Sequence, residues 1–221
     1  MTLSRPSQQG RRIRGGWKVR RPRDGKLRRS KRSSWIGWLA LLALVVAAGA
    51  WAWPQPTVQR YCYPFQYREI VIQEAARTHL QASMVAAVIL QESRFCASAT
   101  SPVGAQGLMQ LMPETGDWVH QHLESRQGRP NLWEPQTNVR LGSTYLSYLA
   151  ERFNGHQVAY LSAYNAGPEH TLEWMSNAPV AGLRVTDIPF PETREYVEAV
   201  LRSERMYRHL YPELETEGTP R

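Results

Sequence analysis

ESRFCASATSPVGAQGLMQLMPET, residues 92–115, joins the end of an apolar helix to a turn rich in glycine and methionine. Before it, Val85, Val88 and Ile89 recur at helical spacing, and Glu92 falls on the same stripe at roughly 100° per residue. A carboxyl group on a buried helix face loses hydration, so its pKa should rise toward the range that a general acid needs. The alternative is a glutamate at a helix end that reaches solvent at the edge of a cleft.

The turn after this helix permits a close approach of the backbone. Residues 101–107 contain a proline and two glycines, which end the helix before a short helical turn begins. We expect this turn to fold back over Glu92, where Met109 and Met112 would form an adaptable apolar wall and Gln110 would supply one amide. Such a surface suits a sugar ring, which has an apolar face and polar edges. Plain core packing of the methionines is the alternative.

Two further blocks follow in the chain: AYNAGP at Ala163–Pro168 and PETREYV at Pro191–Val197. Together with Glu92–Ser93 and the GAQGLMQLMP run, they make the sequence resemble the peptidoglycan lytic transglycosylases of the soluble, goose-lysozyme-like (SLT) type. The resemblance covers about residues 61–211 and leaves out the first 60. It implies an all-α, lysozyme-like catalytic domain.

The resemblance also implies roles for single residues. Glu92 would be the sole catalytic acid and base. Tyr164 resembles the tyrosine beside the catalytic carboxylate, and Ser101 resembles a serine near the cleaved bond, although it could simply turn the chain. The full set expected to bind substrate is Ser101, Met109, Gln110, Met112, Tyr164, Asn165, Glu192 and Tyr196, of which Asn165 could instead serve the turn after Tyr164.

The expected chemistry needs one carboxylate. Most glycosidases use two at a defined separation, but nothing in the matched blocks marks Glu114 or Glu192 as a partner for Glu92. The resemblance implies that Glu92 protonates the oxygen between N-acetylmuramic acid and N-acetylglucosamine, and that the muramic 6-hydroxyl then closes a 1,6-anhydro ring. A hydrolytic lysozyme and a non-catalytic peptidoglycan-binding scaffold remain as alternatives. We expect no cofactor and no metal, since His120 and His122 diverge on a helix.

Coarse periodicity predicts only helices after residue 60, with no hairpin pattern. The catalytic domain is expected over residues 65–211, followed by a short tail at 212–221. The predicted helices are Gln66–Leu80, Ser83–Phe95, Pro113–Leu123, Pro135–Phe153, His156–Asn165, Glu169–Ser176 and Glu192–Leu210.

The first 53 residues predict a membrane anchor. Trp35–Trp53 is uncharged, largely apolar and flanked by tryptophans, which is typical of a transmembrane helix. Residues 1–34 hold 13 Lys and Arg against one Asp, a net charge of +12, so the N-terminus should stay in the cytoplasm of a bacterium. The catalytic domain would then face the periplasm from the inner membrane. The alternative is secretion after signal-peptide cleavage at the small residues 48–50.

The basic tail is expected to be disordered, and it could bind anionic lipid or a cytoplasmic partner. Nucleic-acid binding is not expected, because Trp17 is the only aromatic residue before Trp35. Residues 54–64 contain three prolines and are predicted to be a stiff spacer without secondary structure. Cys62 and Cys96 would pair in an exported domain, or else remain two separate buried thiols.

Overall fold

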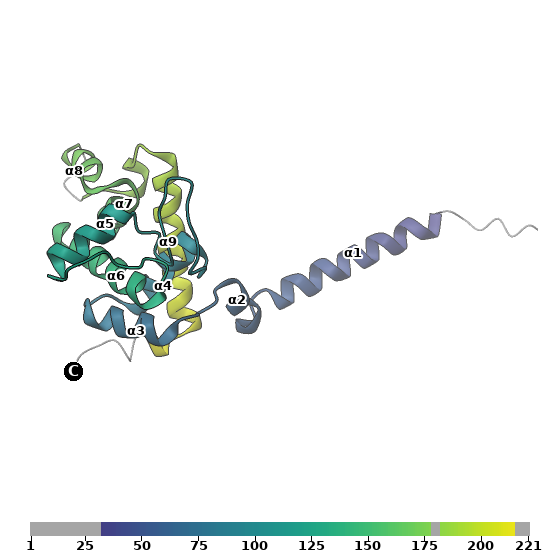
Figure 1. The fold of residues 1–221 in the computed structure, drawn as a ribbon. Helices are drawn as coiled ribbons and strands as arrows, with labels where there is room; N and C mark the ends of the chain where they lie inside the picture. The colour runs from purple at the N-terminus through teal and green to yellow at the C-terminus, as the bar shows by residue number, and fades with distance from the viewer. Residues whose placement is uncertain (1–31, 178–181, 215–221) are drawn as a thin grey trace, which may run out of the picture. The chain divides into compact units, whose positions relative to one another are not determined.

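A computed structural model describes residues 32–177 and 182–214 of the chain (Figure 1). The chain divides into two units, Met1–Ala47 and Ala48–Arg221. Residues 1–31, which make up most of the predicted basic tail, lie outside the described residues. So do residues 215–221 of the predicted C-terminal tail.

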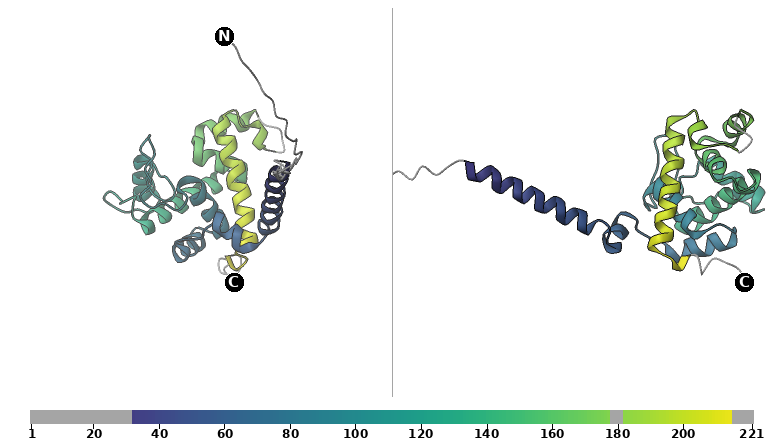
Figure 2. Two further views of the ribbon diagram at one scale, coloured as in Figure 1. Left: turned by 90° about the vertical axis from the view of Figure 1, so that its right-hand side faces the viewer. Right: turned by 180° about the vertical axis from the view of Figure 1, so that it is seen from behind.

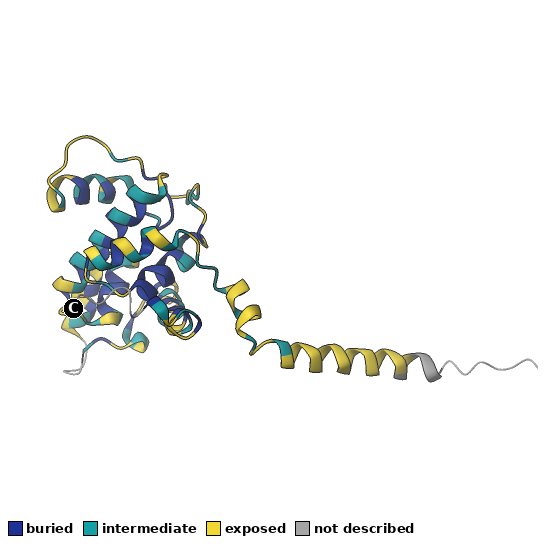
Figure 3. Cartoon of the chain, turned by 90° about the horizontal axis from the view of Figure 1, so that it is seen from below, coloured by how far each residue is buried: buried dark blue, intermediate teal, exposed yellow. Residues whose placement is uncertain are grey.

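Helix α1, Arg32–Ala52, forms over nearly all of the predicted apolar span Trp35–Trp53. Its large apolar side chains are exposed, as Figure 3 shows, and Trp38 reaches 71% exposure. Within the described residues, no single helix combines the length and hydropathy of a membrane span. Gly37–Ala52 and Pro56–Cys62 meet both requirements only when taken together, and they are bent by 88°.

The predicted unstructured spacer is wrong in one respect, because residues Pro56–Cys62 form a short helix, α2. Pro56 stands in its first turn, where the fixed φ of proline favours a helix start and the missing N–H costs nothing. The segment that follows contributes Tyr63 and Phe65 to the edge of the hydrophobic core.

Hydrogen bonds attach this segment to the end of α9, Pro191–Leu210. Arg60 Nη2 donates to the Leu210 carbonyl at 2.7 Å and caps the helix end. The Tyr211 hydroxyl donates to the Tyr63 carbonyl at 2.9 Å, and the Tyr207 hydroxyl donates to the Pro64 carbonyl at 2.8 Å. Residues 60–64 are therefore part of the domain and not a free linker.

The core is built around α4, Ala82–Ser93, which packs along α9 (Figures 1 and 2). All residues from Ala82 to Ile89 are buried, because α4 carries apolar side chains around most of its circumference. Helix α9 is amphipathic instead, and buries Val197, Val200 and Tyr207 on the side facing the core.

The remaining helices surround this pair, and they confirm a helical fold: no β-strand occurs in residues 32–177 and 182–214, where only isolated bridges link residues 100, 106 and 111. The predicted helix Pro113–Leu123 is an α-helix only to Trp118 and then widens into a π-helical turn. The bounds are α3 Arg68–Arg77, α5 Pro113–Trp118, η1 Val119–Leu123, α6 Pro135–Arg152, α7 Gln157–Ala166, α8 Pro168–Ser176 and the 3₁₀ turn η2 Val185–Asp187.

The structure does not form the predicted disulfide. Cys62 and Cys96 are both free and both exposed. Cys62 lies at the end of α2, in a groove that also contains Arg94 and Ser203. Cys96 Sγ lies 3.6 Å from Ser98 Oγ, in the turn that follows α4. The alternative of two separate thiols describes the structure, although neither is buried.

Candidate active site

Glu92 lies one residue before the end of α4, at a sharp change in chain direction. Arg94 and Phe95 both have left-handed backbones, with φ of 51° and 64°. A bulky residue such as Phe95 rarely adopts this conformation, and its burial at 3% exposure helps to hold it. Ser93 Oγ donates to the Leu108 carbonyl at 2.8 Å and joins the end of α4 to the loop that covers it.

Glu92 is only partly buried by its exposed surface, but its carboxyl group is surrounded by enough protein atoms that desolvation raises its pKa from 4.5 to about 7. The direction agrees with the expectation from its position on the apolar stripe. The nearby Tyr196 hydroxyl partly offsets the rise, because a hydrogen-bond donor favours the ionised form. That hydroxyl is buried and has no well-formed hydrogen bond, so the two groups are close but not ideally aligned. Near pH 7, Glu92 can thus both give and accept a proton.

Tyr164 lies on α7 beside the same carboxyl group. Its hydroxyl donates to the Met109 carbonyl at 2.8 Å, which fixes the phenol against the loop after α4. Burial raises the pKa of Tyr164 well above its usual 10.0, and the charge of Glu92 adds to the rise. Burial and the same charge also raise the pKa of Tyr196. Both phenols therefore stay neutral while Glu92 titrates.

The loop over the active site is held by one buried amide, Asn138 on α6. Its Oδ1 accepts from the Met109 N–H at 2.7 Å, and its Nδ2 donates to the carbonyls of Gln106 at 2.9 Å and Leu132 at 2.7 Å. Gly107 lies directly against this amide. A Cβ on Gly107 would lie 2.1 Å from the Leu132 carbonyl oxygen, and its φ of +77° also favours glycine.

Ser101 and Gln110 both serve the loop. Ser101 Oγ accepts from the Ala105 N–H at 3.0 Å, which agrees with the alternative that Ser101 turns the chain. Its hydroxyl can still donate a hydrogen bond to a ligand. Gln110 Nε2 donates to the carbonyls of Ala99 and Gly107 at 3.2 and 2.9 Å. The carbonyl oxygen of the Gln110 amide is then the group that can accept a bond from a sugar hydroxyl.

The two methionines of the loop have different environments. Met109 is fully buried, and its side chain packs on Gly142 of α6, so the prediction that it lines the cleft is wrong. Gly142 leaves the space that this side chain fills, because a Cβ there would lie 2.4 Å from Met109 Sδ. Met112 is 37% exposed at the start of α5 and stays available as an apolar wall.

The last two predicted residues lie near the start of α9. Asn165 is exposed, and its Oδ1 accepts from the Thr193 hydroxyl at 2.7 Å, which links the end of α7 to α9. Glu192 is exposed in the first turn of α9. Its role in binding substrate stays a prediction.

Residues 69–182 match the family described as the transglycosylase SLT domain, which is half of the chain. The chain belongs to this family. It is 35% identical over 152 residues to a soluble lytic murein transglycosylase of Salmonella typhimurium, covering 66% of this chain and 24% of the relative. It is 28% identical over 167 residues to the membrane-bound lytic murein transglycosylase C of Yersinia pestis, covering 65% and 47%.

The SLT-domain fold is also found in a solved structure, that of the 70 kDa soluble lytic transglycosylase of Escherichia coli. The two share 31% identity and a TM-score of 0.65, over 73% of this chain and 27% of the other. The chain therefore spans about a quarter of the soluble relatives that it matches.

Some positioning residues of this SLT domain were not predicted from the sequence. Ser93 directly follows Glu92, and its hydroxyl ties two motifs together. In the sequence, Asn138 is only a polar residue within an amphipathic helix. Its spacing from the apolar residues of α6 could have predicted that it is buried. In the described part of the chain, no three His, Cys, Asp or Glu side chains cluster as metal ligands would.

Proposed function

We propose that this protein is a lytic transglycosylase that cleaves the β-1,4 bond between N-acetylmuramic acid and N-acetylglucosamine in peptidoglycan. The observation that carries the proposal is the burial of Glu92 at the end of α4, which raises its pKa to about 7. A group with this pKa can act as an acid and then as a base in one catalytic cycle. The soluble and membrane-bound relatives named above carry this activity in their names.

The proposed reaction uses one carboxyl group twice, first as an acid and then as a base. Neutral Glu92 donates its proton to the glycosidic oxygen, and the bond from that oxygen to the muramic anomeric carbon breaks. The acetamido oxygen of the same sugar stabilises the positive charge that develops on that carbon. The resulting carboxylate then takes the proton of the 6-hydroxyl, whose oxygen bonds to the anomeric carbon. Glu92 is neutral again, and no water is consumed.

The protein around Glu92 suits both steps. Tyr164 and Tyr196 remain neutral, so neither places beside Glu92 a positive charge that would keep it ionised, as a lysine or arginine would. Met112 has an exposed apolar side chain at the start of α5, and the side-chain oxygen of Gln110 on the same loop is an acceptor for a sugar hydroxyl. Exclusion of water favours attack by the tethered 6-hydroxyl over hydrolysis.

Mass spectrometry of digested peptidoglycan tests this proposal. The full chain in detergent should release muropeptides one water lighter than hydrolysed ones, and Glu92→Gln should release none. Glu195→Gln, which removes an exposed carboxylate from the neighbouring face of α9, is the matched control and should behave as wild type. Reducing ends would instead identify a hydrolytic lysozyme, and binding without any product would identify a scaffold.

We propose further that α1 anchors the protein in the inner membrane, with the N-terminus in the cytoplasm and the SLT domain in the periplasm. The exposed apolar side chains of α1 need a nonaqueous partner, and the +12 charge of residues 1–34 sets the orientation. The same positive charge would place the tail against anionic lipid or a cytoplasmic partner. Protease added to spheroplasts should digest the SLT domain and leave the tail intact, whereas a shortened protein in the soluble fraction would indicate signal cleavage.

A further inference from the structure

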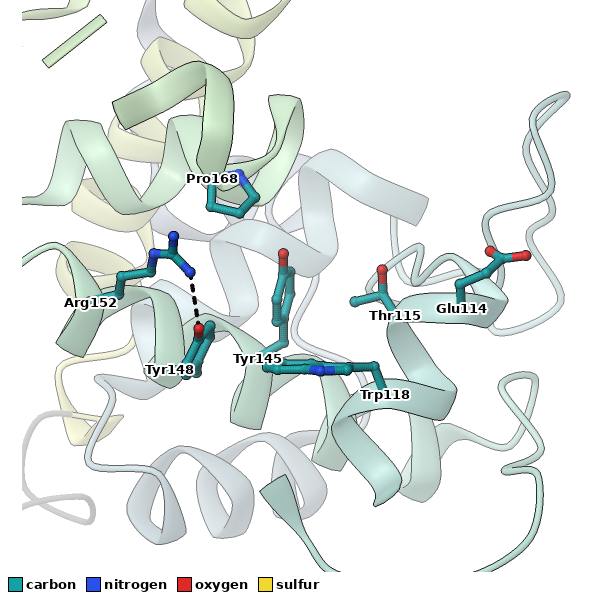
Figure 4. A pocket seen from close by; sticks show the side chains of 7 residues that line it. All are labelled: Glu114, Thr115, Trp118, Tyr145, Tyr148, Arg152 and Pro168. Atoms are coloured by element: carbon teal, nitrogen blue, oxygen red, sulfur yellow. Dashed lines mark hydrogen bonds between the residues drawn. The ribbon is translucent and has the colours of Figure 1, made fainter. Parts of the chain in front are cut away.

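A pocket of about 290 Å³ opens beside the active site, between α5, α6 and the start of α8 (Figure 4). None of its side chains belongs to the set predicted to bind substrate. Its walls include Trp118 from α5, Tyr145, Tyr148 and Arg152 from α6, Pro168 from α8, and Glu114 at one end. We call it the aromatic pocket.

Three rings form one wall of the aromatic pocket. The Trp118 and Tyr148 ring centroids are 5.2 Å apart, and the Tyr145 and Tyr148 rings lie 6.4 Å apart at an interplanar angle of 18°. All three side chains are only partly buried, so the rings still present surface to the pocket. The apolar face of a sugar ring packs well on such a surface, while its hydroxyls keep contact with water at the edges.

The wall continues into the active site. The Tyr145 ring centroid lies 5.6 Å from that of Tyr164, which in turn interacts with the carboxyl group of Glu92. Pro168 ends the AYNAGP block that begins just before Tyr164. A sugar in the aromatic pocket and a sugar beside Glu92 could therefore belong to one glycan strand.

Charge gives the aromatic pocket a direction. Arg152 and Glu114 stand at opposite ends, as Figure 4 shows. Arg152 Nη1 donates to the Tyr148 hydroxyl at 3.1 Å, which orients the guanidinium group. Its carboxylate partner, Glu169, is 3.4 Å away and its side chain is 83% exposed, so the ion pair is weak and a ligand can replace it. An anionic group should thus bind at the Arg152 end.

We propose that the aromatic pocket is a subsite for a sugar of the strand that still carries its peptide, with the ring packed on Trp118 and Tyr145 and a peptide carboxylate bound by Arg152. The proposal rests on the function proposed above. Uncrosslinked stem peptides carry free carboxylates, whereas strands stripped of peptides offer none to Arg152. The subsite would make the enzyme prefer peptide-bearing strands over stripped ones.

Binding measurements in the Glu92→Gln background test this without turnover. The probes are glycan oligosaccharides of equal length with their peptides and the same oligosaccharides after amidase treatment, titrated into the full chain in detergent. Arg152→Gln should weaken binding of the peptide-bearing probe about tenfold and leave the stripped probe unchanged. Trp118→Ala should weaken binding of both by about tenfold.

Arg129→Gln is the matched control, since Arg129 also pairs with a carboxylate at the surface, Asp117 at 3.4 Å, and lies outside the pocket. It should bind both probes as the parent does. Equal losses for both probes with Arg152→Gln would overturn the peptide assignment, and unchanged binding with Trp118→Ala, or with Trp118→Phe if the alanine variant fails to fold, would overturn the subsite. Failure of the function proposed above would show separately, as cleavage products that persist with Glu92→Gln.

Discussion

Replacing Glu92 by glutamine is expected to stabilise the protein, and the gain should depend on pH. Glutamine keeps the size of the side chain and cannot ionise. Glu92 must either stay protonated or carry a poorly solvated negative charge, which lowers the free energy of unfolding. In the unfolded chain the same carboxyl is hydrated and ionises at its usual pKa of 4.5. In the folded state it ionises only near pH 7.

The size of the effect follows from these two values. Below pH 4.5 both states bind the proton, so Glu92 makes no pH-dependent contribution. Between pH 4.5 and about 7 the unfolded state binds fewer protons than the folded state, and the free energy of unfolding falls as pH rises. At about 1.4 kcal/mol for each pH unit, the loss amounts to about 3 kcal/mol above pH 7. The melting temperature of Glu92→Gln should then exceed that of wild type by roughly 6–12 °C.

Thermal and urea unfolding of the full chain in detergent, from pH 4 to 8.5, measures the difference. The two proteins should converge near pH 4 and separate progressively up to about pH 7. Glu173→Gln, which removes an exposed carboxylate on α8, provides the control and should follow wild type at every pH. A gap that is absent at pH 8, or that has the same size at pH 4, would refute the buried, raised-pKa state of Glu92.

Three further changes test the arrangement around Glu92. Tyr196→Phe removes the hydroxyl that lowers the pKa of Glu92, so the alkaline limb of the pH–rate profile should move upward; an unchanged limb contradicts that contact. Asn138→Ala leaves two buried backbone groups without partners, the Met109 N–H and the Leu132 carbonyl, since the Gln106 carbonyl keeps its bond from the Leu111 N–H; it should cost at least about 2 kcal/mol in urea unfolding, and a cost below about 1 kcal/mol would show that the loop rearranges. Gly107→Ala should destabilise the protein much more than Gly104→Ala, because both have positive φ but only Gly107 faces atoms within 4 Å; equal melting temperatures would argue against the close contact.

Prolines and apolar periodicity made most helices predictable. Pro113 and Pro135 each stand at the first position of a helix, and the stripe of α4 led directly to the burial of Glu92. The π turn after Trp118 could not be read in this way, because Val119–Leu123 keeps a helical pattern whatever its hydrogen-bond register. Helix α2 was not predicted, because three prolines in residues 54–64 indicated a spacer. A helix this short is stabilised mainly by contacts with residues far along the chain, such as the bond from Arg60 to the Leu210 carbonyl.

The site was predictable in its chemistry and less so in its packing. The motifs marked Glu92, Tyr164 and Tyr196, and the structure brings these three side chains together. The burial of Met109 depends on Gly142, which is 33 residues away and shows no local sign of the contact. The bond from Ser93 to the loop is likewise a long-range event that spacing cannot reveal.

The attachment of residues 60–64 to the end of α9 has a mechanical consequence. Tension applied at α2 would pass through the hydrogen bonds of residues 60–64 to the C-terminal end of α9. The same helix carries Tyr196, which lies roughly 17 Å from Tyr207 along the axis at 1.5 Å per residue. A chain cut after residue 64 would lose this coupling and leave the end of α9 free to fray. If the protein is anchored by α1 as proposed above, a pull on the anchor would be transmitted along one helix to Tyr196, which lies beside Glu92.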